Sequence, residues 1–258
     1  MSEFGHLLVT GAAGAIGSAL AHALAKRYPN ATLTLVDVDA TRLGDATHAL
    51  GHRAAAACWD LSEPNALAAQ LRDAVEARGP VDILVNCAGI MEVQRLSTMP
   101  WDTASKVLTV DLVSPLRLMQ LVVPDMAERG SGIVINVSSL AGVTPLRGCS
   151  YYGAAKAGLA QASEIARMEL GAQGVQVLTV YPGPVSSDLE RRARDQYRPS
   201  AARERIPTGT PTGLAAAVIR ALDRGAPRVV YPQLFAPARH VPTLSAKVSE
   251  WLGPEPTL

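Results

Sequence analysis

The segment VTGAAGAIG, residues 9–17, follows a short apolar run and precedes an alanine-rich stretch with helical spacing. Gly11, Gly14 and Gly17 permit a tight turn where a strand gives way to a helix, and they let the backbone approach a pyrophosphate. The N-terminus of the following helix would meet the negative charge of that pyrophosphate. The segment therefore predicts a dinucleotide-binding strand–loop–helix unit. Glycines that serve only the turn are the alternative interpretation.

A carboxylate ends the next apolar run. Asp37 closes ATLTLVD, residues 31–37, about 20 residues beyond Gly17, a spacing at which a carboxylate accepts hydrogen bonds from the adenosine ribose hydroxyls. The same carboxylate would repel a 2′-phosphate, so we expect NAD rather than NADP, although Arg42 is close enough in sequence to weaken this preference. No Gly-Lys-Ser/Thr follows the glycines, which excludes a Walker phosphate loop.

Apolar runs rich in Val, Ile and Leu recur along the chain and alternate with longer alanine-rich stretches of helical spacing. Because these runs are apolar throughout, they suit strands that helices cover on both faces of a parallel sheet. The pattern predicts a single α/β domain over residues 1–258, a doubly wound Rossmann-type sheet with helices on both faces. Strands are expected within 6–10, 31–37, 53–60, 81–86, 132–139, 175–181 and 227–232, and helices near 15–27, 63–78, 101–128, 151–171 and 212–224.

Composition favours a small-molecule partner. The chain has 24 Lys and Arg against 23 Asp and Glu, a net charge of +1, which gives no general affinity for nucleic acid. Cys58, Cys87 and Cys149 form no CxxC pair and no HExxH occurs, so we expect no disulfide framework and no metal site, and we expect a reducing cytoplasm. Residues 7–25 lack charged side chains, but their glycines predict a strand, loop and helix rather than a transmembrane segment.

Two segments near the C-terminus interrupt the strand–helix alternation. Residues 186–213, here called the excursion, are charged and rich in arginine. A segment inserted at the carboxyl edge of a sheet lies where α/β proteins bind ligands, so we expect an exposed, mobile substrate lid, with a solvated loop as the alternative. The tail, residues 233–258, is apolar with basic residues between; closing a pocket, joining subunits and resting on a membrane surface are all compatible with it.

The segment CSYYGAAKAG, residues 149–158, places a lysine four residues after the second of two tyrosines. Residues four apart share a helix face, so Tyr152 rather than Tyr151 pairs with Lys156. A free tyrosine ionises at about pH 10. A nearby ammonium, together with the positive ring of an oxidised nicotinamide, stabilises the phenolate and lowers that pKa. The pair predicts a proton donor and acceptor, and Ser139 at the end of GIVINVSS would hydrogen-bond the same substrate oxygen.

Taken in order, these motifs resemble the short-chain dehydrogenase/reductase family over residues 5–232. The matching segments are TGAAGAIG (10–17), WDLS (59–62), NCAG (86–89), NVSSLAG (136–142), YYGAAK (151–156) and YPGPVSSDL (181–189). The resemblance implies one Rossmann-type domain with a seven-stranded parallel sheet. It also implies reversible hydride transfer between the nicotinamide cofactor and a secondary alcohol or ketone, and a homodimer or homotetramer built through helices 101–128 and 151–171.

The resemblance implies roles for individual residues. Tyr152 would exchange the proton, Lys156 would hold the phenolate and the nicotinamide ribose, and Ser139 would steady the charge on the substrate oxygen. The cofactor contacts implied are Gly11, Ala13, Gly14, Ile16, Gly17, Asp37, Asp60, Leu61, Asn86, Ala88, Gly89, Tyr152, Lys156, Pro182, Gly183, Val185 and Ser187.

Two positions depart from the family's pattern. Cys87 replaces the second asparagine of NNAG. Asp111 stands where the family has an asparagine that holds a proton-relay water. We expect Asp111 to anchor that water as part of the catalytic group, while its negative charge would favour the Lys156 ammonium and alter the pKa of the tyrosine. A neutral, near-isosteric exchange is the alternative.

Other functions remain open at this point. A regulatory protein that senses dinucleotide without catalysis is one, which Asp111 favours and the intact Ser139, Tyr152 and Lys156 oppose. An epimerase or dehydratase of the extended branch of the superfamily is another, which the short C-terminal region opposes. The substrate pocket is expected to be lined by Leu140, Val143, Leu146, Arg147, residues 91–96 and the excursion, with Arg147 either meeting a substrate carboxylate or lying on a solvated surface.

Overall fold

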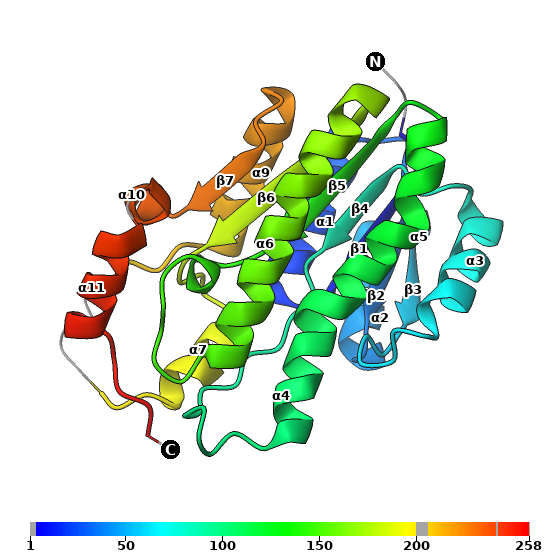
Figure 1. Ribbon diagram of the computed structural model, residues 1–258. Helices are drawn as coiled ribbons and strands as arrows, with labels where there is room; N and C mark the ends of the chain where they lie inside the picture. The colour runs from blue at the N-terminus through cyan, green and yellow to red at the C-terminus, as the bar shows by residue number, and fades with distance from the viewer. Residues whose placement is uncertain (1–3, 200–205, 241, 258) are drawn as a thin grey trace.

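The computed structural model describes residues 4–199, 206–240 and 242–257. Seven parallel strands form one sheet in the order β3-β2-β1-β4-β5-β6-β7 (Figure 1). Their bounds are β1 His6–Thr10, β2 Thr32–Asp37, β3 Ala54–Cys58, β4 Ile83–Asn86, β5 Gly132–Val137, β6 Val175–Pro182 and β7 Arg228–Tyr231. All seven lie where the apolar runs predict them, which confirms the doubly wound α/β fold.

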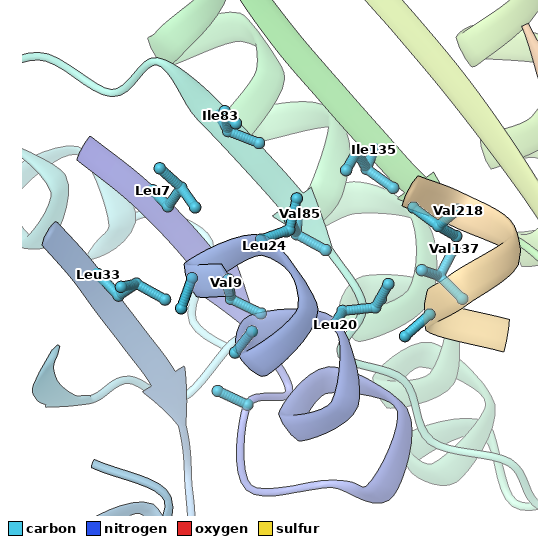
Figure 2. Close-up of a cluster of buried hydrophobic side chains, with 14 of the residues drawn as sticks. Leu7, Val9, Leu20, Leu24, Leu33, Ile83, Val85, Ile135, Val137 and Val218 are labelled. Atoms are coloured by element: carbon cyan, nitrogen blue, oxygen red, sulfur yellow. The ribbon is translucent and has the colours of Figure 1, made fainter. Parts of the chain in front are cut away.

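Helices cover both faces of the sheet because the strands are apolar on both. One layer contains α1 (Ala15–Arg27), α2 (Ala40–Leu50) and α9 (Pro211–Asp223), and the other contains α3 (Leu67–Arg78), α5 (Ser114–Glu128) and α6 (Ser150–Leu170). Side chains of alternate strand residues enter one layer or the other: Val9 packs with Leu24 of α1, whereas Leu8 packs with Leu118 of α5. Figure 2 shows the first of these cores, with Leu20 and Leu24 of α1 lying over the central strands.

The helical run Trp101–Glu128 changes geometry in its middle. It consists of α4 (Trp101–Leu108), a π-helical turn at Thr109–Val113, and α5. Pro115 lacks the N–H that would bond to the Asp111 carbonyl, and its ring would press on that carbonyl, so the helix widens there. The run is long and apolar enough to cross a bilayer, but 44% of its most apolar window is buried inside the fold. Its packing against α3, α6 and β5 accounts for this hydropathy.

Within the described residues, four helices lie where the sequence predicts none: α2, α7 (Asp188–Asp195), α10 (Ala236–His240) and α11 (Pro242–Leu252). The α2 sequence contains Gly44, Asp45 and two threonines, which are weak helix formers, so its composition gives little helical signal. The excursion is also less exposed than expected, because Ala193 of α7 and Tyr197 are buried. Its residues 200–205 lie outside the described residues, as do residues 241 and 258 of the tail.

The site lies at the carboxyl edge of the sheet, where β1 is flanked by β2 on one side and β4 on the other. Chains leaving β1 and β4 turn to opposite faces, which opens a crevice at this point in doubly wound sheets. Thr10 ties the two strand ends together: its hydroxyl donates to the Val85 carbonyl (3.2 Å) and accepts from the backbone N–H groups of Cys87 (3.0 Å) and Ala88 (3.2 Å).

Candidate active site

The glycine loop is as tight as its sequence predicts. Gly11 has φ +66°, a left-handed conformation that disfavours other residues, and a Cβ there would lie 2.8 Å from the Ala88 backbone. A Cβ on Gly17 would lie 2.0 Å from the Gly11 carbonyl oxygen, so only glycine lets α1 begin this close to the loop. Both positions therefore need glycine for steric reasons that hold without any ligand.

The N-terminus of α1 has features that favour the binding of an anion. Gly14 is its N-cap, no side chain caps the helix, and its first turn has no acidic residue. Among the described atoms, a Cβ on Gly14 would have one neighbour, the Gly11 carbonyl oxygen at 3.2 Å, so the outer side of the loop is open. Free backbone N–H groups at a helix N-terminus attract phosphate. The loop that contains Ala13 and Ile16 thus fits the pyrophosphate of a dinucleotide.

Asp37 is fixed beside that loop. Its Oδ2 accepts a hydrogen bond from the Ala13 N–H (3.0 Å), and its Oδ1 accepts from Val38 (2.8 Å) and Asp39 (3.3 Å). The carboxylate is partly exposed at the end of β2. The structure therefore brings Asp37 and the glycine loop together, as the spacing predicts.

The next two strand ends contribute differently. Asp60 is exposed, and hydrogen bonds from the Ser62 hydroxyl and N–H hold the pKa of its carboxyl below the usual range. Leu61 is buried beside it, and its carbonyl accepts from the Ser114 hydroxyl at 2.5 Å. Asn86 is only 2% exposed, and its amide donates to Asn136 (2.8 Å) and to the Pro115 carbonyl (3.4 Å). Its side chain therefore links β4 and β5 inside the core rather than facing the crevice.

Ser139 and Tyr152 meet across the crevice floor. Ser139 follows β5 in extended conformation, and its hydroxyl accepts from the Ala141 N–H (3.1 Å). The same side chain lowers the pKa of Tyr152. The turn after Ser139 packs closely on α6, since a Cβ on Gly142 would lie 2.8 Å from the α6 backbone at Ala157. This close approach places the serine against the first turn of the helix that carries Tyr152.

Lys156 lies on the same face of α6 as Tyr152, as the four-residue spacing predicts. Its Nζ is 5.8 Å from the centre of the Tyr152 ring and donates to the Val137 carbonyl at 3.1 Å. Its own carbonyl accepts from the Ser138 hydroxyl at 2.7 Å, which anchors α6 to the end of β5. The lysine is 4% exposed, so its charge is held inside the protein.

Asp111 supplies the opposite charge. Its Oδ2 is 3.1 Å from Lys156 Nζ, and its Oδ1 accepts from the Ile90 N–H at 2.8 Å. The side chain is fully buried. A Cβ on Gly89 would lie 2.9 Å from Asp111 Oδ2 and 3.2 Å from Lys156 Nζ, so Gly89 provides the space in which the ion pair forms. The π-helical turn presents Asp111 to this space.

The charges of Lys156 and Asp111 shift the pKa of Tyr152 in opposite directions. Burial raises the pKa of Tyr152; Lys156 opposes that rise and Asp111 adds to it. Burial alone would lower the pKa of Lys156, but the charges of Asp111 and Tyr152 raise it above its usual value. Lys156 is thus held as an ammonium next to the phenol. Burial also raises the pKa of Asp111, against the attraction of Lys156.

The end of β6 completes the crevice. Gly183 donates its N–H to the Tyr231 carbonyl at 2.7 Å, and a Cβ there would lie 3.0 Å from Leu140. Pro182 ends the strand, and Val185 is buried where it pairs with Gly209. The Ser187 hydroxyl accepts from the Glu190 N–H (3.1 Å), so it caps α7. This segment lies next to Leu140 and leads directly into the excursion.

The sequence motifs did not identify two supporting residues, Thr10 and Ser138, and they did not reveal the contacts of Arg147. Thr10 and Ser138 are both adjacent in sequence to predicted site residues. This adjacency is the only sequence feature that could have identified them as supporting residues. Arg147 was expected either to meet a substrate carboxylate or to lie on a solvated surface, and it is exposed. There its guanidinium donates to the carbonyls of Gly253 (3.1 Å) and Glu250 (2.6 Å). Arg147 therefore binds the C-terminal tail. The sequence around Arg147 does not reveal this contact, because its partners lie about 100 residues further along the chain.

Comparison with known proteins agrees with this geometry. The family model for short chain dehydrogenases matches residues 5–198. The chain is 30% identical to the ketoacyl reductase HetN of a Nostoc species over 260 residues, covering 96% of this chain and 88% of that protein. It is 34% identical to the D-threitol dehydrogenase of Mycolicibacterium smegmatis over 224 residues, covering 82% and 83%.

Among solved structures, a short-chain dehydrogenase from Sphingobium yanoikuyae in complex with NADPH superposes with a TM-score of 0.80. Its sequence is 26% identical, and the superposition covers 96% of this chain and 95% of that one. The similarity therefore extends over nearly the whole chain.

Proposed function

Because this chain belongs to the short-chain dehydrogenase/reductase family, and is therefore an NAD(P)-dependent oxidoreductase, we propose that it interconverts a secondary alcohol and a ketone. The observation that carries this proposal is the group formed by Ser139, Tyr152 and Lys156: a buried phenol whose pKa a nearby serine lowers and which lies next to a buried ammonium. Such a group exchanges a proton with a substrate oxygen.

In the direction of oxidation, the Tyr152 phenolate takes the hydroxyl proton of the alcohol. The Lys156 ammonium stabilises the phenolate that precedes this step, and the Ser139 hydroxyl donates to the substrate oxygen and steadies its developing charge. When bound, the dinucleotide supplies the acceptor for the hydride that leaves the carbinol carbon. Asp111 acts through Lys156, which it holds charged and in place, and it anchors the water through which the proton leaves.

Gly11, Gly14 and Gly17 with the α1 N-terminus would hold the pyrophosphate, and Asp37 the adenosine ribose. Further contacts are proposed from Ala13, Ile16, Asp60, Leu61, Ala88, Gly89, Pro182, Gly183, Val185 and Ser187, together with Tyr152 and Lys156. Asn86 would act indirectly, by fixing the strand end that carries Ala88 and Gly89.

We propose that NAD is the preferred cofactor. The Asp37 carboxylate is pinned by three backbone N–H groups, so it cannot swing away from a 2′-phosphate. Arg42, the cation that could offset it, pairs with Asp188 at 3.2 Å. Replacing Asp37 by Asn removes the charge and keeps the shape, and the ratio of kcat/KM for NAD over NADP should fall at least about tenfold. Asp39→Asn, the neighbouring carboxylate, should change it less than about threefold.

The proposed reaction is tested by absorbance at 340 nm when the purified protein meets NAD or NADP and a panel of secondary alcohols with cyclic, hydroxyacyl and steroid members. Turnover of at least one alcohol, faster with NAD, is the expected result. A protein that binds NADH tightly and turns over no member of the panel would instead be a dinucleotide sensor. Faster turnover with NADP than with NAD would contradict the role given to Asp37.

We propose further that the protein works in the cytoplasm as a homodimer or homotetramer. Cys58, Cys87 and Cys149 are all unpaired thiols, as expected in a reducing compartment. Burial raises the pKa of Cys87 to about 12, so this thiol beside the crevice stays protonated and unreactive at neutral pH.

A further inference from the structure

The last residues of the chain return to the active-site end of the molecule. Residues 253–257, here called the strap, pair with the chain just after α7: the Thr257 N–H and hydroxyl donate to the Gln196 carbonyl at 2.9 and 2.8 Å. The Arg198 N–H donates to the Glu255 carbonyl at 2.9 Å, and Tyr197 and Pro256 form an antiparallel bridge. Pro256 is buried in this contact.

The other side of the strap is fastened to the loop before α6. Arg147 donates to the Gly253 carbonyl and forms an ion pair with Glu255 at 3.1 Å. Arg95, from the loop after β4, reaches the same carboxylate at 3.6 Å. The Ser249 hydroxyl donates to the Pro145 carbonyl just before the strap. Glu255 therefore joins two loops that are about 50 residues apart in sequence, as its contacts with residues 95 and 147 show.

The residues that the strap holds are those that surround Tyr152. Tyr197 lies in one buried cluster with Val93, Cys149 and Tyr152. Its hydroxyl donates to the Arg147 carbonyl (2.8 Å) and lies 3.0 Å from the Cys149 Sγ. The strap thus holds the end of α7 against the buried cluster that contains Tyr152.

Gln196 connects the end of α7 to the loop after β4 through hydrogen bonds. Its side-chain oxygen accepts from the Val93 N–H at 3.0 Å, and its amide donates to the Glu92 carboxylate at 3.0 Å. The Gln94 N–H in turn donates to the Gly148 carbonyl at 2.9 Å. Three segments, residues 92–95, 145–149 and 196–198, are therefore hydrogen-bonded to one another around Tyr152, and the strap contacts each of them.

We propose that the strap sets the size limit of the alcohol or ketone by latching α7 against the loop before α6. This inference rests on the proposed function, because it concerns the substrate pocket of that same site. The two ion pairs of Glu255 in this contact are exposed, and exposed ion pairs are weak enough to open and close in each cycle. Closing over a pocket, one of three roles compatible with the tail, is the one these contacts support.

The latch can be tested without catalysis. In Glu255→Gln, loss of both ion pairs should raise amide hydrogen exchange at least about threefold in residues 145–149 and 193–198, while exchange in β1 and α1 stays unchanged. Asp223→Asn is the matched control, since it breaks an equally exposed ion pair, with Arg27 at 3.0 Å, far from the crevice. Unchanged exchange in Glu255→Gln, or an equal change in the control, would overturn the proposal.

The size limit is tested with the alcohols that the protein oxidises. In Glu255→Gln, and more strongly in a chain ending at residue 252, kcat/KM for the bulkiest substrate divided by that for the smallest should rise at least about threefold, with KM for NAD within twofold. An unchanged ratio would overturn the size limit, and an altered oligomeric state with unchanged exchange would assign the tail to a subunit contact instead. Failure to oxidise any alcohol would refute the proposed function, while the exchange measurement would still decide whether the strap holds α7.

Discussion

The carboxylate of Asp111 lies against the Lys156 ammonium with no exposure to solvent. An asparagine at this position would bind the same Ile90 N–H without a charge. The negative charge of Asp111 matters because electrostatic interactions between charges are stronger in a buried, low-dielectric site than in water. Asp111 keeps Lys156 protonated, and at the same time it makes the Tyr152 phenolate harder to form.

Asp111→Asn should therefore move the pH dependence of alcohol oxidation toward lower pH. Oxidation needs the phenolate, Asp111 raises the pKa of Tyr152, and removing its charge lowers that pKa again. The midpoint of the rise of kcat/KM with pH reports this change. Asp102→Asn, on the same helical run but exposed, should leave the midpoint in place. A midpoint that moves to higher pH would contradict the arrangement.

At this scale the sequence predicts the pairing of Tyr152 with Lys156, because four-residue spacing on a helix decides it. It also predicts that Asp111 influences Lys156. The direct ion pair could not be predicted, since it depends on the π-helical turn and on the space left by Gly89. The inward-facing side chain of Asn86 depends on the pairing of β4 with β5, which a local motif does not specify.

Among the elements, the junction of β1 and α1 is the most constrained. Gly17→Ala would bring a Cβ to 2.0 Å from the Gly11 carbonyl oxygen, and both atoms belong to rigid backbone. We expect a loss of at least about 2 kcal/mol in the free energy of unfolding, of the size seen for overpacking, and weaker NADH binding.

The matched substitution is Gly44→Ala in α2, where an added Cβ would meet nothing within 4 Å. Alanine suits a helix interior better than glycine, so this variant should gain about 0.5–1 kcal/mol. Thermal unfolding followed by circular dichroism measures both changes. A Gly17→Ala variant as stable as the wild type would show that the loop and α1 are not in such close contact.

The sequence predicts the seven strands, from their continuous apolar runs, and five helical regions, those of α1, α3, α4–α5, α6 and α9. It does not predict α2, which contains Gly44 and other weak helix formers and buries only Leu43. The arginine pairs of α7 suggest a wholly exposed segment, yet Ala193 and Tyr197 turn inward. In a short helix, many charged side chains on one face make it difficult to recognise from the sequence that the opposite face is apolar and buried.

For the whole molecule, subunit association remains a prediction that the outer surface of α4 and α6 supports. Trp101, Ile165 and Met168 are 66%, 46% and 74% exposed there, and these helices lie on the same side of the sheet as α5 (Figure 1). Large exposed apolar side chains of this kind mark contact surfaces. They belong to the two helical regions through which the sequence predicts association.

Met168→Glu should therefore shift the protein toward the monomer in size-exclusion chromatography with light scattering, because a buried, unpaired carboxylate opposes association. Leu234→Glu is the control: Leu234 is 69% exposed but lies beyond β7, at the edge of the sheet. Dissociation by Leu234→Glu alone would place the interface at that edge instead.

The central claim is that Tyr152 exchanges the proton with the substrate oxygen, and one substitution tests it directly. Tyr152→Phe removes the hydroxyl and keeps the ring that packs with Val93 and Cys149. The measurement compares kcat, from absorbance at 340 nm, with NADH affinity, from fluorescence titration of the same samples. We predict that kcat falls at least about 10²-fold while the dissociation constant of NADH changes less than about twofold. Turnover that persists near the wild-type rate in Tyr152→Phe would contradict the assignment and the mechanism built on it.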